Sequence, residues 1–174
     1  MPKLVWGIKV IPEKATANFG VGLHGMDFQL EFARGAPGRL FYSNKELAAF
    51  LEGQPKLQNS GLGYIRYTVR PGMKIVERTR YYPFANISDP KDPLQRTALS
   101  ALQGKGIARA LWKATARHMQ QKYRGFAYKE GQPAMYYHRH AQQLERMGIV
   151  PGQQMAFSTL FRKMAGARRR KRPL

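Results

Sequence analysis

The clearest chemical pattern in the chain is a row of basic residues, each four positions after the last, in an alanine-rich stretch. The stretch covers residues 105–122, lacks proline and carries glycine only at its start, so local propensity favours a helix. The four cations are Lys105, Arg109, Lys113 and Arg117. Residues four apart share one helix face, and like charges there repel by about 0.2–0.5 kcal/mol per pair. A stripe that only faces water is the alternative interpretation. No acidic residue stands four positions from any of these cations, so the pattern instead predicts a partner with several phosphates.

The charge of the whole chain points in the same direction. Its 30 Lys and Arg outnumber 10 Asp and Glu, a formal net charge of +20 over 174 residues. The excess is concentrated in residues 93–174, where the only acidic residues are Glu130 and Glu145. Such a balance predicts a nucleic acid as the partner. The same bias adds further candidate contacts: His118, Lys122, Arg168, Arg169 and Arg170.

A glycine motif overlaps the start of the basic stretch. Gln103 to Ala108 fit Q-x-x-G-x-A, in which backbone N–H groups at a helix start can hold a pyrophosphate. The motif is similar to the acetyl-coenzyme A loop of GCN5-related acetyltransferases. In that family a strand leads into the loop, whereas the preceding residues 94–102 are predicted here to form a helix. An acetyltransferase therefore stays an alternative function.

Histidine supplies the candidate catalytic chemistry. An imidazole with an unperturbed pKa of about 6.5 can accept a proton at neutral pH, so a histidine such as His24 is a candidate base. A lone histidine beside glycines is, however, often structural. His138 and His140 form an H-R-H pair, but no cysteine or nearby carboxylate completes a metal site. We predict no metal and no cofactor, and a solvated or phosphate-facing role for the pair.

The elements that position these residues follow from the hydrophobic pattern. Strands are predicted over 4–11, 27–32, 62–70 and 73–80, with Pro12 closing the first. P-G joins the last two, as a hairpin or as a strand followed by an irregular extension. A weak helix is expected over 13–26, and a second opens with a capping box at Ser43 and Glu46 and ends at Gly53. The order is strand, helix, strand, strand, helix, strand. It predicts a ferredoxin-like (RRM-like) domain over 1–88, within an α+β protein.

The second region, residues 89–174, is predicted to be basic and mainly helical. It holds helices over 94–102, 105–122 and 133–147, with short strands at 125–128 and 155–161. The chain has no cysteine, no apolar run long enough to span a membrane, and no signal-peptide core at its start. We therefore expect a cytoplasmic protein with no membrane partner.

Several segments, taken in order, give the chain a resemblance to a known family. They are G-L-H-G-M-D-F-Q-L-E with His24, R-L-F-Y-S-N-K-E-L-A-A-F-L over 39–51, I-V-E-R-T-R over 75–80, and G-I-A-R-A-L-W-K-A-T-A-R over 106–117. In this order they resemble the CRISPR repeat-processing endoribonucleases, most closely the type I-F branch. The resemblance runs loosely over residues 1 to about 164.

The resemblance implies a function and a set of residue roles. Such a protein binds the stem-loop of a CRISPR repeat transcript, cuts at the 3′ base of the stem without a metal, and stays bound as the cap of a surveillance complex with other subunits. It implies that His24 is the base acting on the ribose 2′-hydroxyl, giving a cyclic phosphate. It also implies that the basic helix is inserted in the groove of the stem, with Arg109, Lys113 and Arg117 as its phosphate contacts. Arg78 and Arg80 match the positions of side chains that read bases near the stem's foot.

The chain departs from the family pattern around the scissile phosphate. The family adds a serine and a late tyrosine there, but Gly148 falls near the serine position and no tyrosine follows Tyr137. Ser158 and Tyr136 are the candidates that could take those roles. A non-catalytic RNA-binding subunit therefore stays open as an alternative to the endoribonuclease.

Overall fold

The protein is an α+β structure built on one seven-stranded sheet. The computed structural model describes residues 2–16, 19–131 and 138–169, without the side chains of 138, 139 and 167–169. The strands follow the spatial order β3-β1-β2-β4-β5-β6-β7. Their bounds are β1 Val5–Lys14, β2 His24–Gly35, β3 Phe41–Tyr42, β4 Gly61–Arg70, β5 Ile75–Tyr82, β6 Ala127–Glu130 and β7 Gln154–Met155. Among the described strands only β5 and β6 pair in parallel; the other neighbours are antiparallel.

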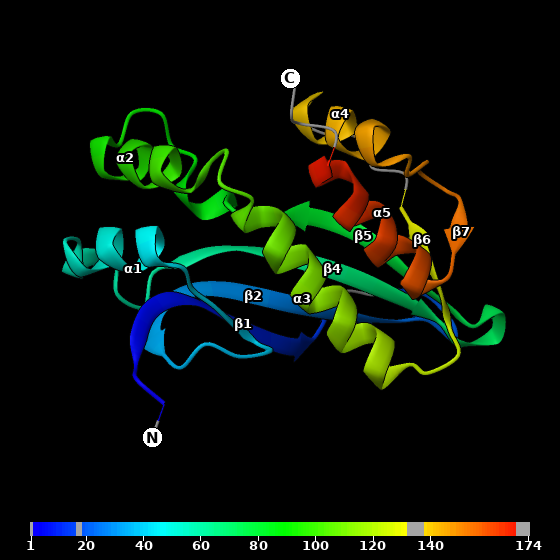
Figure 1. The fold of residues 1–174 in the computed structure, drawn as a ribbon. Helices are drawn as coiled ribbons and strands as arrows, with labels where there is room; N and C mark the ends of the chain where they lie inside the picture. Colours follow the sequence, from blue (N-terminus) through cyan, green and yellow to red (C-terminus); the bar gives the residue numbers. More distant parts are fainter. Residues whose placement is uncertain (1, 17–18, 132–137, 170–174) are drawn as a thin grey trace.

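In the part of the chain that the structure describes, five helices connect and cover the strands (Figure 1). They are α1 Lys45–Glu52, α2 Pro93–Leu102, α3 Ile107–Lys122, α4 His138–Met147 and α5 Phe157–Arg169, with short 3-10 turns at Pro55–Leu57, Pro71–Met73 and Ala85–Ile87. Helix α1 confirms the predicted helix and its stop at Gly53, but its N-cap is Asn44, whose side chain accepts from the N–H of Leu47. The Ser43 hydroxyl instead donates to the carbonyl of Trp6 in β1.

The start of the chain differs from the prediction. The described residues of 13–26 form no helix; β1 and β2 form an antiparallel hairpin with Ile8 opposite Phe32. Gly20 and Gly22 take positive φ angles of 82° and 74° in the connecting loop, a backbone conformation that suits a turn. β1 also continues past Pro12, which is tolerated because β3 pairs with β1 only at Ile8 and Lys9. The predicted ferredoxin-like order is therefore not confirmed, and the sheet is larger than predicted.

The second half of the chain adds to the same sheet. β6 pairs with β5, so the predicted boundary at residue 88 does not interrupt the sheet. The predicted helices over 94–102 and 105–122 correspond to α2 and α3, although α3 begins at Ile107. The predicted strand over 155–161 is wrong: β7 ends at Met155, and the rest forms α5. Its apolar residues, Phe157, Leu160, Phe161 and Met164, have helical spacing.

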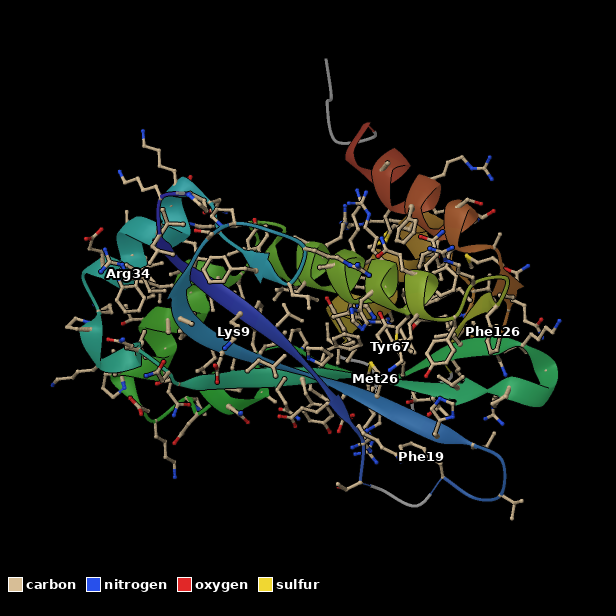
Figure 2. All side chains as sticks on the ribbon, turned by 90° about the horizontal axis from the view of Figure 1, so that it is seen from below. Lys9, Phe19, Met26, Arg34, Tyr67 and Phe126 are labelled. Atoms are coloured by element: carbon tan, nitrogen blue, oxygen red, sulfur yellow. The ribbon has the colours of Figure 1, made fainter. Side chains whose placement is uncertain are left out.

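The helices pack on one face of the sheet. Met26, Phe28, Leu30 and Phe32 of β2 point to this face and form a single core cluster with buried side chains from all five helices. Met26 and Tyr67 lie between the sheet and α3, whereas Phe19 lies in the loop on the other side of the sheet (Figure 2). The described helices leave that second face uncovered (Figure 1). None of the helices described is both long and apolar enough to cross a membrane.

Candidate nucleic-acid interface

Helix α3 presents two chemically different faces. Ile107, Leu111, Ala116 and Met119 are buried in the core. Arg109 and Lys113 are partly exposed and Arg117 is exposed, on the side turned away from the sheet. Because four residues advance an α-helix by about 6 Å, successive cations are spaced along the helix rather than clustered at one point. The predicted stripe therefore exists for these three residues.

Lys105 does not belong to this row. It lies in the turn before α3 and forms an ion pair with Glu46 of α1, with 3.1 Å between Nζ and Oε2. Both side chains are largely exposed, so the pair contributes little to stability. Its charge is offset by a carboxylate, and it lies at the opposite end of α3 from Arg117.

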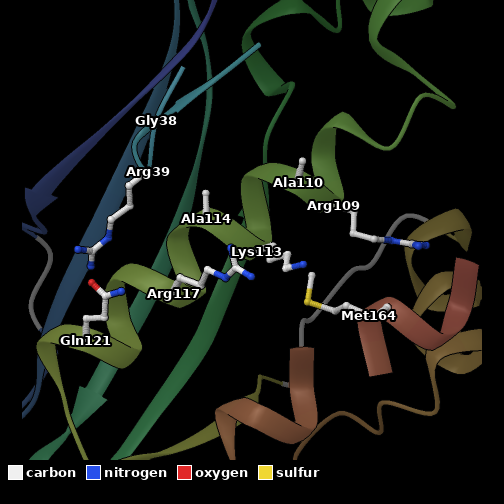
Figure 3. Close-up of a pocket in the computed structure, with 10 residues that line it drawn as sticks. Gly38, Arg39, Arg109, Ala110, Lys113, Ala114, Arg117, Gln121 and Met164 are labelled. Atoms are coloured by element: carbon white, nitrogen blue, oxygen red, sulfur yellow. The ribbon is translucent and has the colours of Figure 1, made fainter. Parts of the chain in front are cut away.

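The three cations line a groove with walls from other elements (Figure 3). Its volume is about 520 Å³. Arg39 enters from the loop between β2 and β3 and points toward Gln121 near the end of α3, while Met164 and Ala165 of α5 form the opposite wall. The groove thus combines segments far apart in the sequence, and we call it the basic groove.

The basic groove is strongly positive. Four of its lining residues are cations, namely Arg39, Arg109, Lys113 and Arg117, and none of the lining residues is acidic. The guanidinium carbon of Arg117 lies 5.6 Å from the ring centroid of Phe161 in α5. A concave surface lined by one sign of charge concentrates the opposite charge from solution. The arrangement suits an elongated anion such as a phosphate backbone.

The local acids do not offset this field. Residues 93–174 contain only Glu130 and Glu145 as acids. Glu130 is fully buried, and its carboxylate accepts from the Nε of Arg78 at 3.0 Å, so its charge is neutralised inside the protein. Of the two acids in residues 93–174, only Glu145 is therefore left to offset the positive charge at the surface of this region.

Arg78 is not available to an RNA ligand. It is 1% exposed, and its guanidinium lies 4.2 Å from the ring centroids of both Tyr81 and Trp112. Burial lowers the pKa of Arg78, but the attraction of Glu130 outweighs this and keeps the group charged. The predicted base contact at this position is corrected to a buried structural ion pair. Arg80, two residues on, is exposed on the other face of the sheet.

His140 belongs to the same buried cluster. Its Nε2 lies 2.7 Å from a guanidinium nitrogen of Arg78. Burial and the Arg78 charge lower the pKa of His140 to about 3, so the ring is neutral and accepts this hydrogen bond. The expected solvated or phosphate-facing role is therefore wrong for His140. Residue 138 is described only in its backbone, and the described residues contain no cluster of three metal-ligating side chains.

The structure places His24 at the start of β2, beside the end of α3. Its Nε2 lies 2.7 Å from the hydroxyl of Tyr123, the residue that caps α3. Burial raises the pKa of the Tyr123 phenol, which keeps it neutral as a hydrogen-bond partner. Six residues separate Arg117 from Tyr123, about 9 Å along the helix axis. His24 thus lies at the end of α3 that carries Gln121, one of the residues that line the basic groove.

The remaining predicted residues lie in various surroundings. His118 is half-buried with its ring edge-on to Phe28 at 5.3 Å between centroids, and burial, Arg39 and Lys122 lower its pKa. Lys122 is exposed beside the Tyr123 ring. Ser158 is exposed in the first turn of α5. Tyr136 and Arg170 lie outside the described residues, and Arg168 and Arg169 are described only as backbone at the end of α5.

The glycine motif occupies a helix-to-helix turn. Gln103 caps α2, and Gly106 caps α3 with a positive φ of 76°. A helix and not a strand leads into this loop, as the apolar pattern of 94–102 predicted. The loop therefore lacks the strand that precedes the pyrophosphate loop in acetyltransferases.

Three residues of the site escaped the sequence reasoning: Arg39, Gln121 and Tyr123. Arg39 stands in a glycine- and proline-rich turn that carries no pattern of its own. Gln121 lies about one turn beyond Arg117 but is uncharged, and Tyr123 follows the helix. Only the tertiary contact between a loop, a helix end and a strand start brings them together.

Comparisons with known proteins give no relative. No protein-family model, curated protein or solved structure matches the chain. The class that the fold and site define is an α+β protein with a basic groove, and its function is argued from that geometry.

Proposed function

We propose that the protein binds the phosphate backbone of a folded RNA stem in the basic groove. The observation that supports this is the convergence of Arg39, Arg109, Lys113 and Arg117 on one groove without an acidic lining residue. Electrostatic contacts to phosphates provide most of the affinity for nucleic acids that are bound without base reading. RNA stems suit this mode because A-form helices are recognised mainly by shape and backbone.

The geometry also suggests how the stem would sit. The cations line a recess between α3, α5 and the loop carrying Arg39, and α3 does not project from the surface as a free helix (Figure 3). An α-helix with its side chains is about 10–12 Å wide, and here one face is committed to the sheet. A phosphate strand lying in the recess fits this arrangement better than a helix inserted into the stem's groove.

We extend the proposal to the processing of a CRISPR repeat transcript, on the resemblance in sequence. His24 would take the proton of a ribose 2′-hydroxyl, whose oxygen attacks the adjacent phosphorus. The bond to the 5′-oxygen breaks and that oxygen takes a proton from water, leaving a cyclic phosphate and a 5′-hydroxyl. The Tyr123 hydroxyl is hydrogen-bonded to Nε2 of His24. The ribose 2′-hydroxyl must therefore displace the tyrosine from Nε2 or approach Nδ1 of the ring. The product would stay in the groove and cap a larger complex.

Binding is tested by salt dependence. A triple variant, Arg109→Gln, Lys113→Gln and Arg117→Gln, is compared with a control that removes three exposed charges elsewhere, Arg96→Gln, Arg124→Gln and Arg146→Gln. Each lost phosphate contact lowers the slope of log affinity against log salt by about 0.9, so three change the response between 50 and 200 mM salt by about 40-fold. Fluorescence anisotropy with a labelled RNA hairpin measures both slopes. Equal slopes in the two variants would remove the groove from the proposal.

Cleavage is tested separately from binding. RNA that copurifies with the protein is sequenced, and a longer transcript containing its hairpin is incubated with the protein in EDTA. We expect a cyclic phosphate end at one position, lost in His24→Ala and retained in part in Tyr123→Phe, with hairpin affinity unchanged in both. Intact RNA bound tightly by the wild type would instead favour the non-catalytic RNA-binding subunit, and cleavage by His24→Ala would exclude His24 as the base.

A further inference from the structure

The face of the sheet that carries no helix has a cluster of rings and guanidinium groups at its centre. Residues that alternate with the core positions point to this face, including Tyr64 and Arg66 of β4 and Arg80 and Tyr82 of β5. Phe19 joins them from the loop before β2, where its ring lies against Gly25. We call these five residues the outer cluster.

The two tyrosines form a pair across the strands. Tyr64 is directly opposite Tyr82, and their ring centroids are 5.6 Å apart at an angle of 49°. Both rings are only partly buried. A cross-strand aromatic pair stabilises a sheet modestly, and on an uncovered face its remaining ring surface is open to a ligand.

The two arginines differ in whether a neighbouring carboxylate neutralises their charge. Arg66 is opposite Arg80, a like-charge pairing that is unfavourable in a sheet. Asp27 neutralises Arg66 through two hydrogen bonds of 2.6 and 2.8 Å, and the Arg66 guanidinium lies between the rings of Phe19 and Tyr64. Arg80 is exposed and donates to the Tyr64 hydroxyl at 3.4 Å, and it forms no ion pair with any described residue. A positive charge thus stands beside two open rings.

We propose that the outer cluster binds single-stranded nucleic acid, with bases stacked on Tyr64 and Tyr82 and a phosphate held by Arg80. Aromatic rings and guanidinium planes are the side chains on which unpaired bases stack, and a cation beside them holds the backbone. The net charge of +20 favours a polyanion over a neutral or basic partner. This site lies on the opposite face of the sheet from the basic groove and does not depend on the proposed stem binding.

The test uses the full chain and a labelled ten-nucleotide oligouridine in anisotropy titrations. Tyr82→Leu and Tyr64→Leu are each expected to weaken binding by about 5- to 100-fold, since one stacked base contributes on that scale. Tyr82→Phe should stay close to the wild type because it keeps the ring. Arg80→Gln should lower the salt slope by about 0.7, the value for one phosphate contact on a single strand.

Two further measurements locate the effect. The basic-groove triple variant is titrated with the same oligonucleotide, and the leucine variants are titrated with the RNA hairpin, so that each surface is tested with both ligands. Circular dichroism and thermal melting check that the variants fold. Crosslinking with 4-thiouridine should modify peptides containing residue 64 or 82.

Unchanged oligonucleotide affinity in both folded leucine variants would overturn the proposal. So would crosslinks confined to α3. A change of oligomeric state in light scattering without a change in oligonucleotide affinity would assign the outer cluster to contact between copies of the chain, again against nucleic acid.

Discussion

The buried ion pair of Arg78 gives the sharpest test of how this fold is stabilised. Arg78 and Glu130 are both fully buried, and the guanidinium is stacked between Tyr81 and Trp112. Arg78→Met removes the cation and leaves the Glu130 carboxylate without its charged partner in the core. Breaking one side of a buried pair costs about 3–5 kcal/mol of unfolding free energy. Loss of two desolvated cation–π contacts acts in the same direction.

The expected loss is large enough for simple assays. For a chain of this size, 1 kcal/mol corresponds to about 2–4 °C in Tm, so Arg78→Met should lower Tm by about 6–20 °C. Urea denaturation followed by tryptophan fluorescence gives the free energy directly, and Trp112 reports on the site itself. The matched control is Arg80→Met, two residues along the same strand and exposed, which should stay within about 0.5 kcal/mol of the wild type.

Two outcomes would refute this reasoning. If Arg78→Met is as stable as Arg80→Met, the pair does not hold the core as the structure shows. If Arg78→Met folds with normal stability but loses RNA affinity, the residue acts at the surface, as its sequence position first suggested. A double variant, Arg78→Met with Glu130→Leu, should recover part of the stability because it buries no unpaired charge.

Three other predictions follow from local features. The pKa of His140 is about 3 in the folded protein and about 6.5 in the unfolded chain. Between these pH values the unfolded chain binds one more proton than the folded protein. The unfolding free energy should therefore fall by up to about 1.4 kcal/mol per pH unit as the pH drops below about 6.5. His140→Gln should show a shallower loss in urea titrations at pH 7, 6 and 5, and equal slopes would contradict the assignment. Asn44→Ala should cost about 1 kcal/mol through loss of the α1 N-cap, with Asn44→Ser close to the wild type in the same assay; an unperturbed alanine variant would mean that the cap contributes nothing. Gly63→Ala should cost about 1–3 kcal/mol because its Cβ would lie 2.0 Å from the Tyr82 carbonyl oxygen, whereas Gly72→Ala meets open space; similar melting of the two would disprove the close approach.

The errors of the sequence reasoning share a physical cause. The spacing of Ala15, Phe19, Leu23 and Met26 suits a helix, but glycines with positive φ make the segment a hairpin loop, and Phe19 covers Gly25 instead. The short apolar run at 155–161 fits either a strand or a helix. Whether this run forms a strand or a helix depends on whether a neighbouring strand can pair with it or a face of the core must be covered. Both conditions depend on residues distant in the sequence, so the run itself does not reveal them.

The sequence by itself determined the basic character of the second half, the basic row on α3, the end of α1 at Gly53 and the hairpin of β4 and β5. These follow from composition, residue spacing and turn chemistry, which act over a few residues at a time. Only the tertiary structure decided that Arg78 is buried against Glu130 while Arg80 is exposed, because burial depends on which distant elements cover a strand. The same holds for the basic groove, since Arg39 and α3 meet only when the sheet and helices are packed together.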